Sequence, residues 1–272
     1  MANTVVITGA SQGIGKATAL KFASQGYDIV MAARQWNRLE AAASEVRSLG
    51  REALAISTDV TDPQQVENLV QKAIAHFGSV DILINNASIF TVGSVEQFLL
   101  NDWQQVINTN VWGYIYTINA LLPHFLEQGK GTIVNVSSIG GLDPIPYQIP
   151  YTTSKYAVTG LTKALHAELS PLGIQVCGIY PSFIRTSIVE RTIFRGEDEE
   201  ITQARHDLVD MAMHTPVLEK AEDVAQAIWH AVKYQRSDVI VGTAKLWNTT
   251  FQLFPGLMKS ILRRVFGMKE RQ

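Results

Sequence analysis

A tyrosine and a lysine stand four positions apart in the stretch PYTTSKYA at residues 150–157. On a helix, Tyr151 and Lys155 would share one face, one turn from each other. A free phenol has a pKa of about 10, which makes it a poor proton shuttle at neutral pH. A positive lysine nearby would favour the phenolate and lower that pKa, which would make the pair an acid/base catalyst. The alternative is a solvated Tyr–Lys pair on an ordinary helix.

A second stretch, TGASQGIG at 8–15, carries glycines in the spacing G-x-x-x-G-x-G. Gly9, Gly13 and Gly15 would let the backbone turn tightly and approach a phosphate, and the next helix would present free N–H groups to that anion. A glycine turn alone is a weak signal, and an ordinary strand-to-helix turn is the alternative. Its place after the first β-rich run favours a dinucleotide site that also includes Ser11, Gln12 and Ile14.

The residue after the second β-rich run discriminates between dinucleotides. An acid there accepts the ribose 2′-OH of NAD, whereas a basic residue accommodates the 2′-phosphate of NADP. The run DIVMAAR ends on Arg34 and has no acid there, since Asp28 lies at its start. Arg34 offers a planar fork of donors, and Ser11 could add another. We therefore expect NADP(H) to be preferred and NAD(H) to be possible, unless Arg34 is only a solvated surface charge.

Strands and helices that would position these residues alternate along the chain. β-rich runs lie at 4–9, 27–33, 53–58, 80–87, 131–138, 174–181 and 237–242, and helical stretches lie at 15–26, 36–50, 62–78 and 221–235. Runs with little polar alternation are typical of strands covered on both faces. Alternation of strand and helix predicts an α/β fold, a single-domain doubly wound (Rossmann) parallel sheet of about seven strands with helices on both faces.

Composition excludes several other classes. The 272 residues are 46% hydrophobic and 18% charged, which is typical of a globular protein with a full-sized core. A net charge of −2 gives no reason to expect nucleic acid as a partner. The single cysteine, Cys177, cannot form an internal disulfide, and neither a targeting segment nor a membrane span is visible, so we expect a cytoplasmic protein. The histidines have no metal-ligand spacing, and no G-x-S-x-G indicates a hydrolase.

Five motifs in one order give a more specific indication: TGASQGIG, NNAS at 85–88, NTNVWG at 108–113, VSS ahead of YTTSK, and PSFIRT at 181–186. With these motifs the chain resembles the short-chain dehydrogenase/reductase (SDR) family over about residues 3–245. The resemblance implies a hydride transfer between NADP(H) and a carbonyl or secondary alcohol. It also implies a homodimer or homotetramer. A nicotinamide-dinucleotide-binding regulatory protein without turnover is the alternative.

The resemblance assigns roles to four catalytic residues. Tyr151 is implied as the acid/base, and Lys155 as the group that lowers its pKa and holds the nicotinamide ribose. Ser138, thirteen positions before the tyrosine, is implied to hydrogen-bond the substrate carbonyl, with its neighbour Ser137 the less favoured choice. Asn110 is implied to anchor a water in a proton path.

The same resemblance implies contacts along the cofactor. Asn86 and Ala87 would lie along the adenosine-side ribose, and Asp59 and Val60 beside the adenine. Pro181, Ile184 and Thr186 would bracket the nicotinamide amide. Two positions depart from the family, because Ser88 and Ser182 stand where glycine is usual. Both replacements are small and touch no proton-transfer group.

Two further segments are predicted around this centre, within a catalytic domain at 1–245. Residues 187–216 would form a substrate lid and 140–150 an apolar rim, which favours a medium-sized hydrophobic substrate. The extension at 246–272 places apolar residues at helical spacing, followed by basic residues. Such an extension could pack on protein, on its own subunit or at an oligomer interface, or make a peripheral membrane contact.

Overall fold

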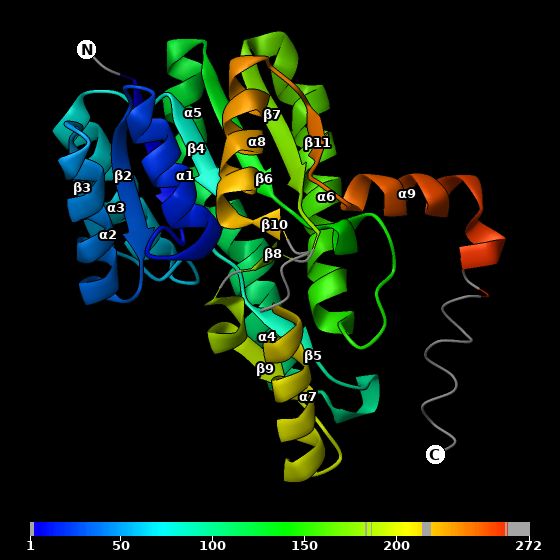
Figure 1. Cartoon of the computed structure of the whole chain (residues 1–272). Coiled ribbons are helices and arrows are strands. Elements are labelled where there is room, and N and C mark those ends of the chain that lie inside the picture. Colours follow the sequence, from blue (N-terminus) through cyan, green and yellow to red (C-terminus); the bar gives the residue numbers. More distant parts are fainter. Residues whose placement is uncertain (1–2, 183, 186, 214–218, 259, 261–272) are drawn as a thin grey trace.

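Seven parallel strands form the central sheet of the computed structural model, in the order β11-β7-β6-β4-β1-β2-β3 (Figure 1). The structure describes residues 3–182, 184–185, 187–213, 219–258 and 260. The sheet strands are β1 (Thr4–Thr8), β2 (Asp28–Ala33), β3 (Ala53–Ser57), β4 (Ile82–Asn85), β6 (Gly131–Val136), β7 (Ile174–Tyr180) and β11 (Asp238–Ile240). Every neighbouring pair runs parallel, so the predicted sheet is confirmed.

Helices cover both faces of this sheet. Buried side chains of α1 (Gly13–Ser24), α2 (Trp36–Ser48) and α8 (Ala221–Lys233) share one core cluster. Those of α3 (Pro63–Phe77), α5 (Gly113–Gln128) and α6 (Ile149–Leu169) share the other. Successive strand residues alternate between the clusters, as in β1, where Val5 and Ile7 join the first and Val6 the second. Burial on both faces explains why the strands have near-continuous apolar sequences.

The reversal of strand order locates the site. The chain proceeds outward from β1 through β2 to β3, and then crosses to β4 on the other side of β1. In such open sheets, ligands bind where the order reverses, outside the carboxyl ends of the strands. The predicted motifs follow these ends directly: Gly9 follows β1 closely, and Arg34, Asn86, Ser137 and Pro181 follow β2, β4, β6 and β7. The fold therefore gathers residues that lie far apart in the sequence at one edge.

Local sequence accounts for the helix ends near this edge. The carboxylate of Asp62 caps α3 by accepting from the backbone N–H groups of Gln64 and Gln65, at 2.9 and 3.3 Å, and Pro63 fills the first helical position. Gly78 ends the helix with a φ of +76°. The helical stretch predicted at 62–78 is therefore confirmed as α3.

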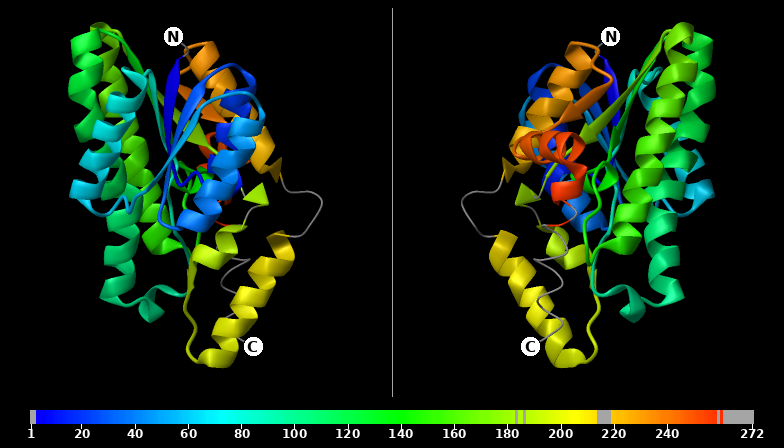
Figure 2. Two further views of the ribbon diagram at one scale, coloured as in Figure 1. Left: turned by 90° about the vertical axis from the view of Figure 1, so that its left-hand side faces the viewer. Right: turned by 90° about the vertical axis from the view of Figure 1, so that its right-hand side faces the viewer.

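Small elements that the sequence pattern did not predict lie beyond the carboxyl edge of the sheet. β5 (Phe90–Val92) pairs with β9 (Thr192–Phe194), and β8 (Ile184–Arg185) pairs with β10 (Glu219–Lys220). The 3₁₀ helix η5 (Ser187–Arg191) and α7 (Glu199–Met213) complete this lobe, which projects below the sheet (Figures 1 and 2). The predicted lid at 187–216 lies in this lobe as far as residue 213, and residues 214–216 are outside the described part.

The chain leaves the sheet through α9 (Ala244–Leu253), which points away from the body in Figure 1. Ala244, Asn248 and Met258 are buried, and Asn248 Nδ2 donates to both carboxylate oxygens of the buried Asp143, at 3.2 and 3.3 Å. The predicted boundary after residue 245 falls inside α9, and the division into domain and extension stays a prediction. Within the described ranges no helix is both long and apolar enough to cross a membrane.

Candidate active site

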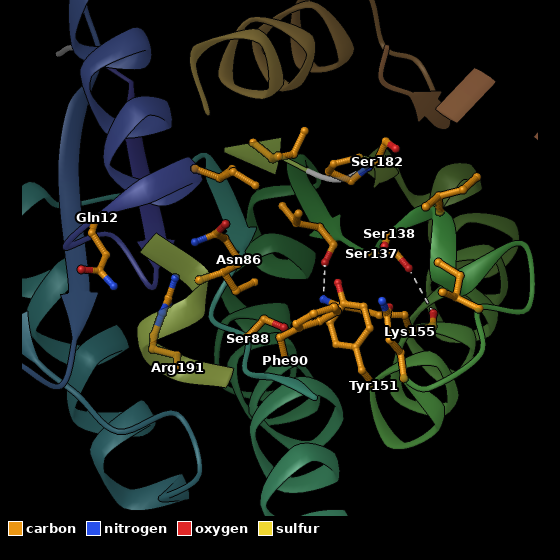
Figure 3. Close-up of a pocket in the computed structure, with 18 residues that line it drawn as sticks. Gln12, Asn86, Ser88, Phe90, Ser137, Ser138, Tyr151, Lys155, Ser182 and Arg191 are labelled. Atoms are coloured by element: carbon orange, nitrogen blue, oxygen red, sulfur yellow. Dashed lines mark hydrogen bonds between the residues drawn. The ribbon is translucent and has the colours of Figure 1, made fainter. Parts of the chain in front are cut away.

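Two adjoining cavities open at the carboxyl edge of the sheet. The first, which we call the tyrosine cavity, has a volume of about 810 Å³ with its open mouth included (Figure 3). Of the predicted site residues, Gln12, Ile14, Asn86, Ser138, Tyr151, Lys155, Pro181 and Ile184 line it. Its other lining residues include the apolar Phe90, Ile139, Ile145 and Ile188. The fold thus brings the predicted proton-transfer groups together beside an apolar surface.

The second cavity, which we call the arginine cavity, has a volume of about 730 Å³ on the same basis. Gly9, Ser11, Gln12, Arg34, Asp59, Val60 and Ala87 line it, and all were predicted as cofactor residues. Gly13, Gly15 and Asn110 line neither cavity. Thr186 lies outside the described residues. Pro181 and Ile184, predicted for the nicotinamide side, therefore line the first cavity, and the predicted adenosine-side residues line the second, except Asn86, which lines the first.

Tyr151 lies near the start of α6 and is 8% exposed. Its ring meets Phe90 edge to face, with centroids 4.7 Å apart, and its backbone N–H donates to Thr91 Oγ1 at 3.3 Å. Burial raises the pKa of Tyr151 to about 12, and a hydrogen bond with Ser138 opposes that shift. Figure 3 shows the tyrosine within the cavity beside Lys155, across from Gln12 and Arg191.

Lys155 lies one turn further along α6 and is 1% exposed. Its Nζ donates to the carbonyl of Val136 at 2.9 Å and lies 5.5 Å from the centroid of the Tyr151 ring. Burial lowers the pKa of Lys155 to about 7. The predicted geometry, two side chains on one helix face, is present.

The electrostatic prediction for this pair was wrong for the protein groups alone. The sequence predicted that Lys155 would lower the pKa of Tyr151, whereas burial raises it. Removal from water penalises both the phenolate and the ammonium, so each residue is driven toward its neutral form. The opposing effect on the phenol comes from the Ser138 hydroxyl rather than from the lysine.

The two serines after β6 have different environments. The Ser137 hydroxyl is 3.1 Å from the carbonyl of Lys155 and 3.0 Å from Thr159 Oγ1, so it joins β6 to α6. Ser138 Oγ accepts from the N–H of Gly140 at 3.1 Å and lines the tyrosine cavity. A hydroxyl that accepts this bond still has its proton to donate into the cavity. These contacts support the choice of Ser138 over Ser137.

Asn110 lies in a π-helical turn, Asn108–Trp112, between α4 (Leu100–Ile107) and α5. Its side chain is fully buried and holds the loop before β5 by bonds with both the N–H and the carbonyl of Ile89, at 2.9 and 3.0 Å. Its Nδ2 also donates to Ser154 Oγ at 3.0 Å, and that hydroxyl donates to the carbonyl of Tyr151 at 2.6 Å. Asn110 therefore fixes the turn of α6 that carries the tyrosine.

The glycine turn after β1 is held by close contacts. A Cβ on Gly15 would approach the carbonyl oxygen of Gly9 to 2.3 Å, and Gly9 itself has a φ of +65°. Asn86 Nδ2 donates to the carbonyls of Thr8 and Gly9, at 3.0 and 3.2 Å. No side chain caps the start of α1, where Gln12 occupies the N-cap position. The first N–H groups of α1 therefore lack a side-chain cap beside the two cavities.

The adenosine-side residues form a charged wall. Arg34 is exposed at the end of β2, and Arg38 donates to Gln12 Oε1 at 2.7 Å and to Glu190 Oε2 at 2.5 Å. Asp59 Oδ1 accepts from the N–H and hydroxyl of Thr61 at 3.0 and 2.9 Å, which fixes the loop after β3. Glu190 lies in η5 and was not predicted as a site residue.

Sequence reasoning missed several cavity residues. Phe90, Ile145, Gln148 and Arg191 line the tyrosine cavity, and Arg191 lines the arginine cavity as well. Ile145 and Gln148 fall within the predicted rim at 140–150, but no residue signal singled them out. Arg191 had no signal at all, because the lid lies more than 150 positions from the glycine turn in sequence.

Comparisons with known proteins agree with this geometry. Residues 3–195 match the model of the short chain dehydrogenase family. The curated 3-oxoacyl-[acyl-carrier-protein] reductase FabG of Staphylococcus aureus is 33% identical, over 75% of this chain and 83% of the relative. A crystal structure of a short chain dehydrogenase/reductase from Burkholderia phymatum in complex with NAD has a TM-score of 0.86 and 29% identity, over 94% and 95% of the two chains.

A second solved structure, the short-chain dehydrogenase from Sphingobium yanoikuyae in complex with NADPH, has a TM-score of 0.76 and 30% identity. It covers 94% of this chain and 95% of its own. The matched family model spans more than half of the chain, including the glycine turn, Ser138, Tyr151 and Lys155. The chain belongs to the short-chain dehydrogenase family of oxidoreductases.

Proposed function

We propose that the protein binds NADP(H) and reduces the carbonyl group of a medium-sized hydrophobic substrate to the secondary alcohol. The observation that carries this proposal is the adjacency of the two cavities. One holds Tyr151, Ser138 and Lys155 beside an apolar wall, and the other combines the glycine turn with exposed arginine. The length of a dinucleotide suits both, with the nicotinamide beside the tyrosine and the adenosine beside Arg34.

The residues fit such a cofactor on structural grounds. Gly15 closely approaches the Gly9 carbonyl, and the start of α1 has no side-chain cap, as an anion site requires. The relatives from Burkholderia phymatum and Sphingobium yanoikuyae bind NAD and NADPH, respectively, which supports a dinucleotide but leaves the choice between the two to Arg34. When bound, the nicotinamide supplies or accepts the hydride.

The protein's own groups handle the oxygen and its proton. In carbonyl reduction negative charge develops on the substrate oxygen, where the Ser138 hydroxyl donates a hydrogen bond and Tyr151 delivers a proton. Lys155 lies beside the tyrosine, where it would hold the nicotinamide ribose. Asn110 positions the turn of α6 that carries Tyr151 and is assigned to the proton path.

The raised pKa of Tyr151 bears on its protonation state before the reaction. In the cofactor-free protein a phenol whose pKa is about 12 keeps its proton at neutral pH, and this is the form that donates to the substrate oxygen. Alcohol oxidation would instead require the phenolate, which burial disfavours. Burial therefore keeps Tyr151 in the protonated form that reduction uses, whereas an oxidised, positively charged nicotinamide would favour the phenolate.

Substitution of Arg34 tests the proposed preference for NADP(H). We expect wild-type kcat/KM to be higher with NADPH than with NADH, and Arg34→Ala to reduce that ratio about tenfold to hundredfold, because a charge-assisted bond to the 2′-phosphate is lost. Arg236→Ala, at the amino end of β11 and far from the carboxyl edge, is the matched control. A wild-type preference for NADH would remove this assignment.

Turnover itself is tested by NADPH oxidation at 340 nm against carbonyl compounds graded by size and polarity. We expect medium-sized apolar ketones to react best, because isoleucine and phenylalanine side chains line the tyrosine cavity. Dinucleotide binding without turnover on any member of the panel would favour the regulatory alternative over the enzyme.

The extension after β11 leads to a proposal about assembly. Leu246, Leu253, Phe254 and Leu257 are each more than half exposed, although Asn248 and Met258 of the same segment are buried. We propose that this apolar surface contacts a second copy in a cytoplasmic homo-oligomer, a dimer or tetramer. A peripheral membrane contact is the alternative, supported by the basic residues that follow in the sequence.

The double variant Leu253→Glu and Phe254→Glu distinguishes a contact with a second copy of the chain from a contact with a membrane. If the surface joins protomers, the variant is expected to sediment as a smaller species than the wild type, while neither floats with anionic liposomes. Flotation of the wild type that the variant loses would instead establish the membrane contact. Unchanged sedimentation without flotation would contradict both proposals, and fractionation of cell lysate would test the cytoplasmic location.

A further inference from the structure

Arg191 lies at the junction of the two cavities. Three residues, Gln12, Ser88 and Arg191, line both the tyrosine cavity and the arginine cavity. Gln12 comes from the glycine turn and Ser88 from the loop after β4, whereas Arg191 ends η5 in the lid. A dinucleotide that spans both cavities places its pyrophosphate at this junction, since the pyrophosphate links its two nucleosides.

The guanidinium of Arg191 is available to a ligand. Its Nε is buried and has no hydrogen-bond partner in the protein. A buried donor without a partner is unusual in native structures and calls for an explanation such as a missing ligand. Its charged neighbours are Glu190, which is already paired with Arg38, and the two arginines Arg34 and Arg38. Arg191 itself stays ionised at neutral pH.

Glu190, the residue before Arg191, holds η5 in place. Glu190 Oε2 accepts from Arg38 Nη1 at 2.5 Å, and the same guanidinium nitrogen donates to Gln12 Oε1 at 2.7 Å. The lid is thereby tied to α2 and to the residue just before α1. Thr192 Oγ1 donates to the carbonyl of Ile188 at 2.9 Å, which stabilises η5 at its far end. Figure 3 shows Arg191 between Gln12 and Ser88, across the cavity from Lys155.

We propose that Arg191 binds the pyrophosphate of the dinucleotide, so that the lid segment closes directly on the cofactor as well as on the substrate. The inference rests on the proposed cofactor-binding function. Next to Gln12 at the same junction, the first N–H groups of α1 have no side-chain cap, and a helix N-terminus favours an anion. Two donor sets, one at the start of α1 and one on η5, would then contact the same phosphates.

The test compares ligands with and without the pyrophosphate. Dissociation constants for NADPH, 2′-phospho-ADP-ribose and adenosine 2′-phosphate are measured by calorimetry on wild type, Arg191→Ala and Arg191→Lys. We expect Arg191→Ala to weaken the first two ligands about tenfold to hundredfold, and adenosine 2′-phosphate less than twofold, because only the first two carry the pyrophosphate. Arg191→Lys should recover part of the loss, because it keeps the charge without the planar fork.

Arg236→Ala is the matched control and should leave all three constants unchanged, and thermal unfolding of each variant shows that it is folded. Equal affinity of wild type and Arg191→Ala for 2′-phospho-ADP-ribose would overturn the proposal while dinucleotide binding stands. An equal loss for adenosine 2′-phosphate would also overturn it, since Arg191 would then act through general charge or structure. A wild type that binds neither NADPH nor NADH overturns the proposed function and this inference together.

Discussion

Replacing Tyr151 with phenylalanine is expected to lower kcat for carbonyl reduction by about 10²- to 10⁴-fold, the range that a general acid contributes. The variant loses only the hydroxyl, which is the group that delivers the proton. The ring keeps its place, because its edge-to-face contact with Phe90 and its backbone bond to Thr91 do not involve the hydroxyl. The dissociation constant for NADPH should change by less than about threefold. Steady-state turnover and cofactor titration on the same preparation measure both effects.

Tyr156→Phe is the matched control for this substitution. Tyr156 lies on the same helix, but it is 44% exposed and its hydroxyl donates to the carbonyl of Leu142. Loss of that hydroxyl removes a surface hydrogen bond without touching the tyrosine cavity, so turnover should stay within about twofold of wild type. If Tyr151→Phe retains more than a tenth of wild-type turnover, Tyr151 is not the proton donor and the catalytic assignment fails.

Local sequence predicted the seven strands of the central sheet, the helices α1, α2, α3 and α8, and the positions of the motifs. The Asp62–Pro63 start of α3 and the glycine stop at Gly78 depend on interactions within a few residues, so they can be derived from the chain alone. The site motifs could be located because parallel strands bring their carboxyl ends to one edge. Alternation of strand and helix was therefore enough to place Gly9 and Arg34 at that edge, whereas Asn86 was implied by the family resemblance.

The remaining features depend on contacts between distant parts of the chain. Arg191 reaches the glycine turn through η5, whose path is fixed by the pairing of β9 with β5, about one hundred residues earlier. The preference for Ser138 over Ser137 rests on where Lys155 and Thr159 of α6 lie. Neither relation leaves a periodic pattern in the sequence, because neither depends on local spacing.

The pKa of Tyr151 could not be predicted from local spacing either. Helical spacing placed Lys155 one turn away correctly, and Coulomb attraction alone would lower the tyrosine pKa. Burial acts in the opposite direction and is the larger effect for both residues. Spacing gives the sign of the pairwise interaction, whereas the desolvation of each group depends on how much of the fold covers it.

Replacing Lys155 with methionine is expected to stabilise the cofactor-free protein at neutral pH while lowering turnover at least tenfold. Burial holds the pKa of Lys155 near 7, against an ordinary value of 10.5. That difference corresponds to at most about 5 kcal/mol of destabilisation, at about 1.4 kcal/mol per pKa unit. Methionine has a similar shape and no charge to desolvate. The carbonyl of Val136 keeps a partner, because the Tyr114 hydroxyl also donates to it at 3.0 Å.

The dependence on pH follows from proton binding. Between pH 7 and 10.5 the unfolded chain keeps the lysine proton and the folded protein has lost it, so the free energy of unfolding of the wild type rises with pH. Below pH 7 Lys155 is protonated in both the folded and the unfolded state, so its full destabilising effect is present and does not change with pH. Urea unfolding of the cofactor-free protein from pH 6.5 to 9.5 should therefore show a rise of several kcal/mol in the wild type and a much smaller one in Lys155→Met.

Lys163→Met controls for the loss of a charge from the same helix, because Lys163 is exposed and should leave the slope unchanged. Equal pH slopes for wild type and Lys155→Met would show that the buried amine is not the source of the rise. If Lys155→Met is more stable than the wild type but has lower turnover, the amine of Lys155 is retained beside the tyrosine at a cost in folding stability. That combination is expected of a catalytic residue. A lysine kept for its structural role would stabilise the fold, so its removal would lower the free energy of unfolding instead of raising it.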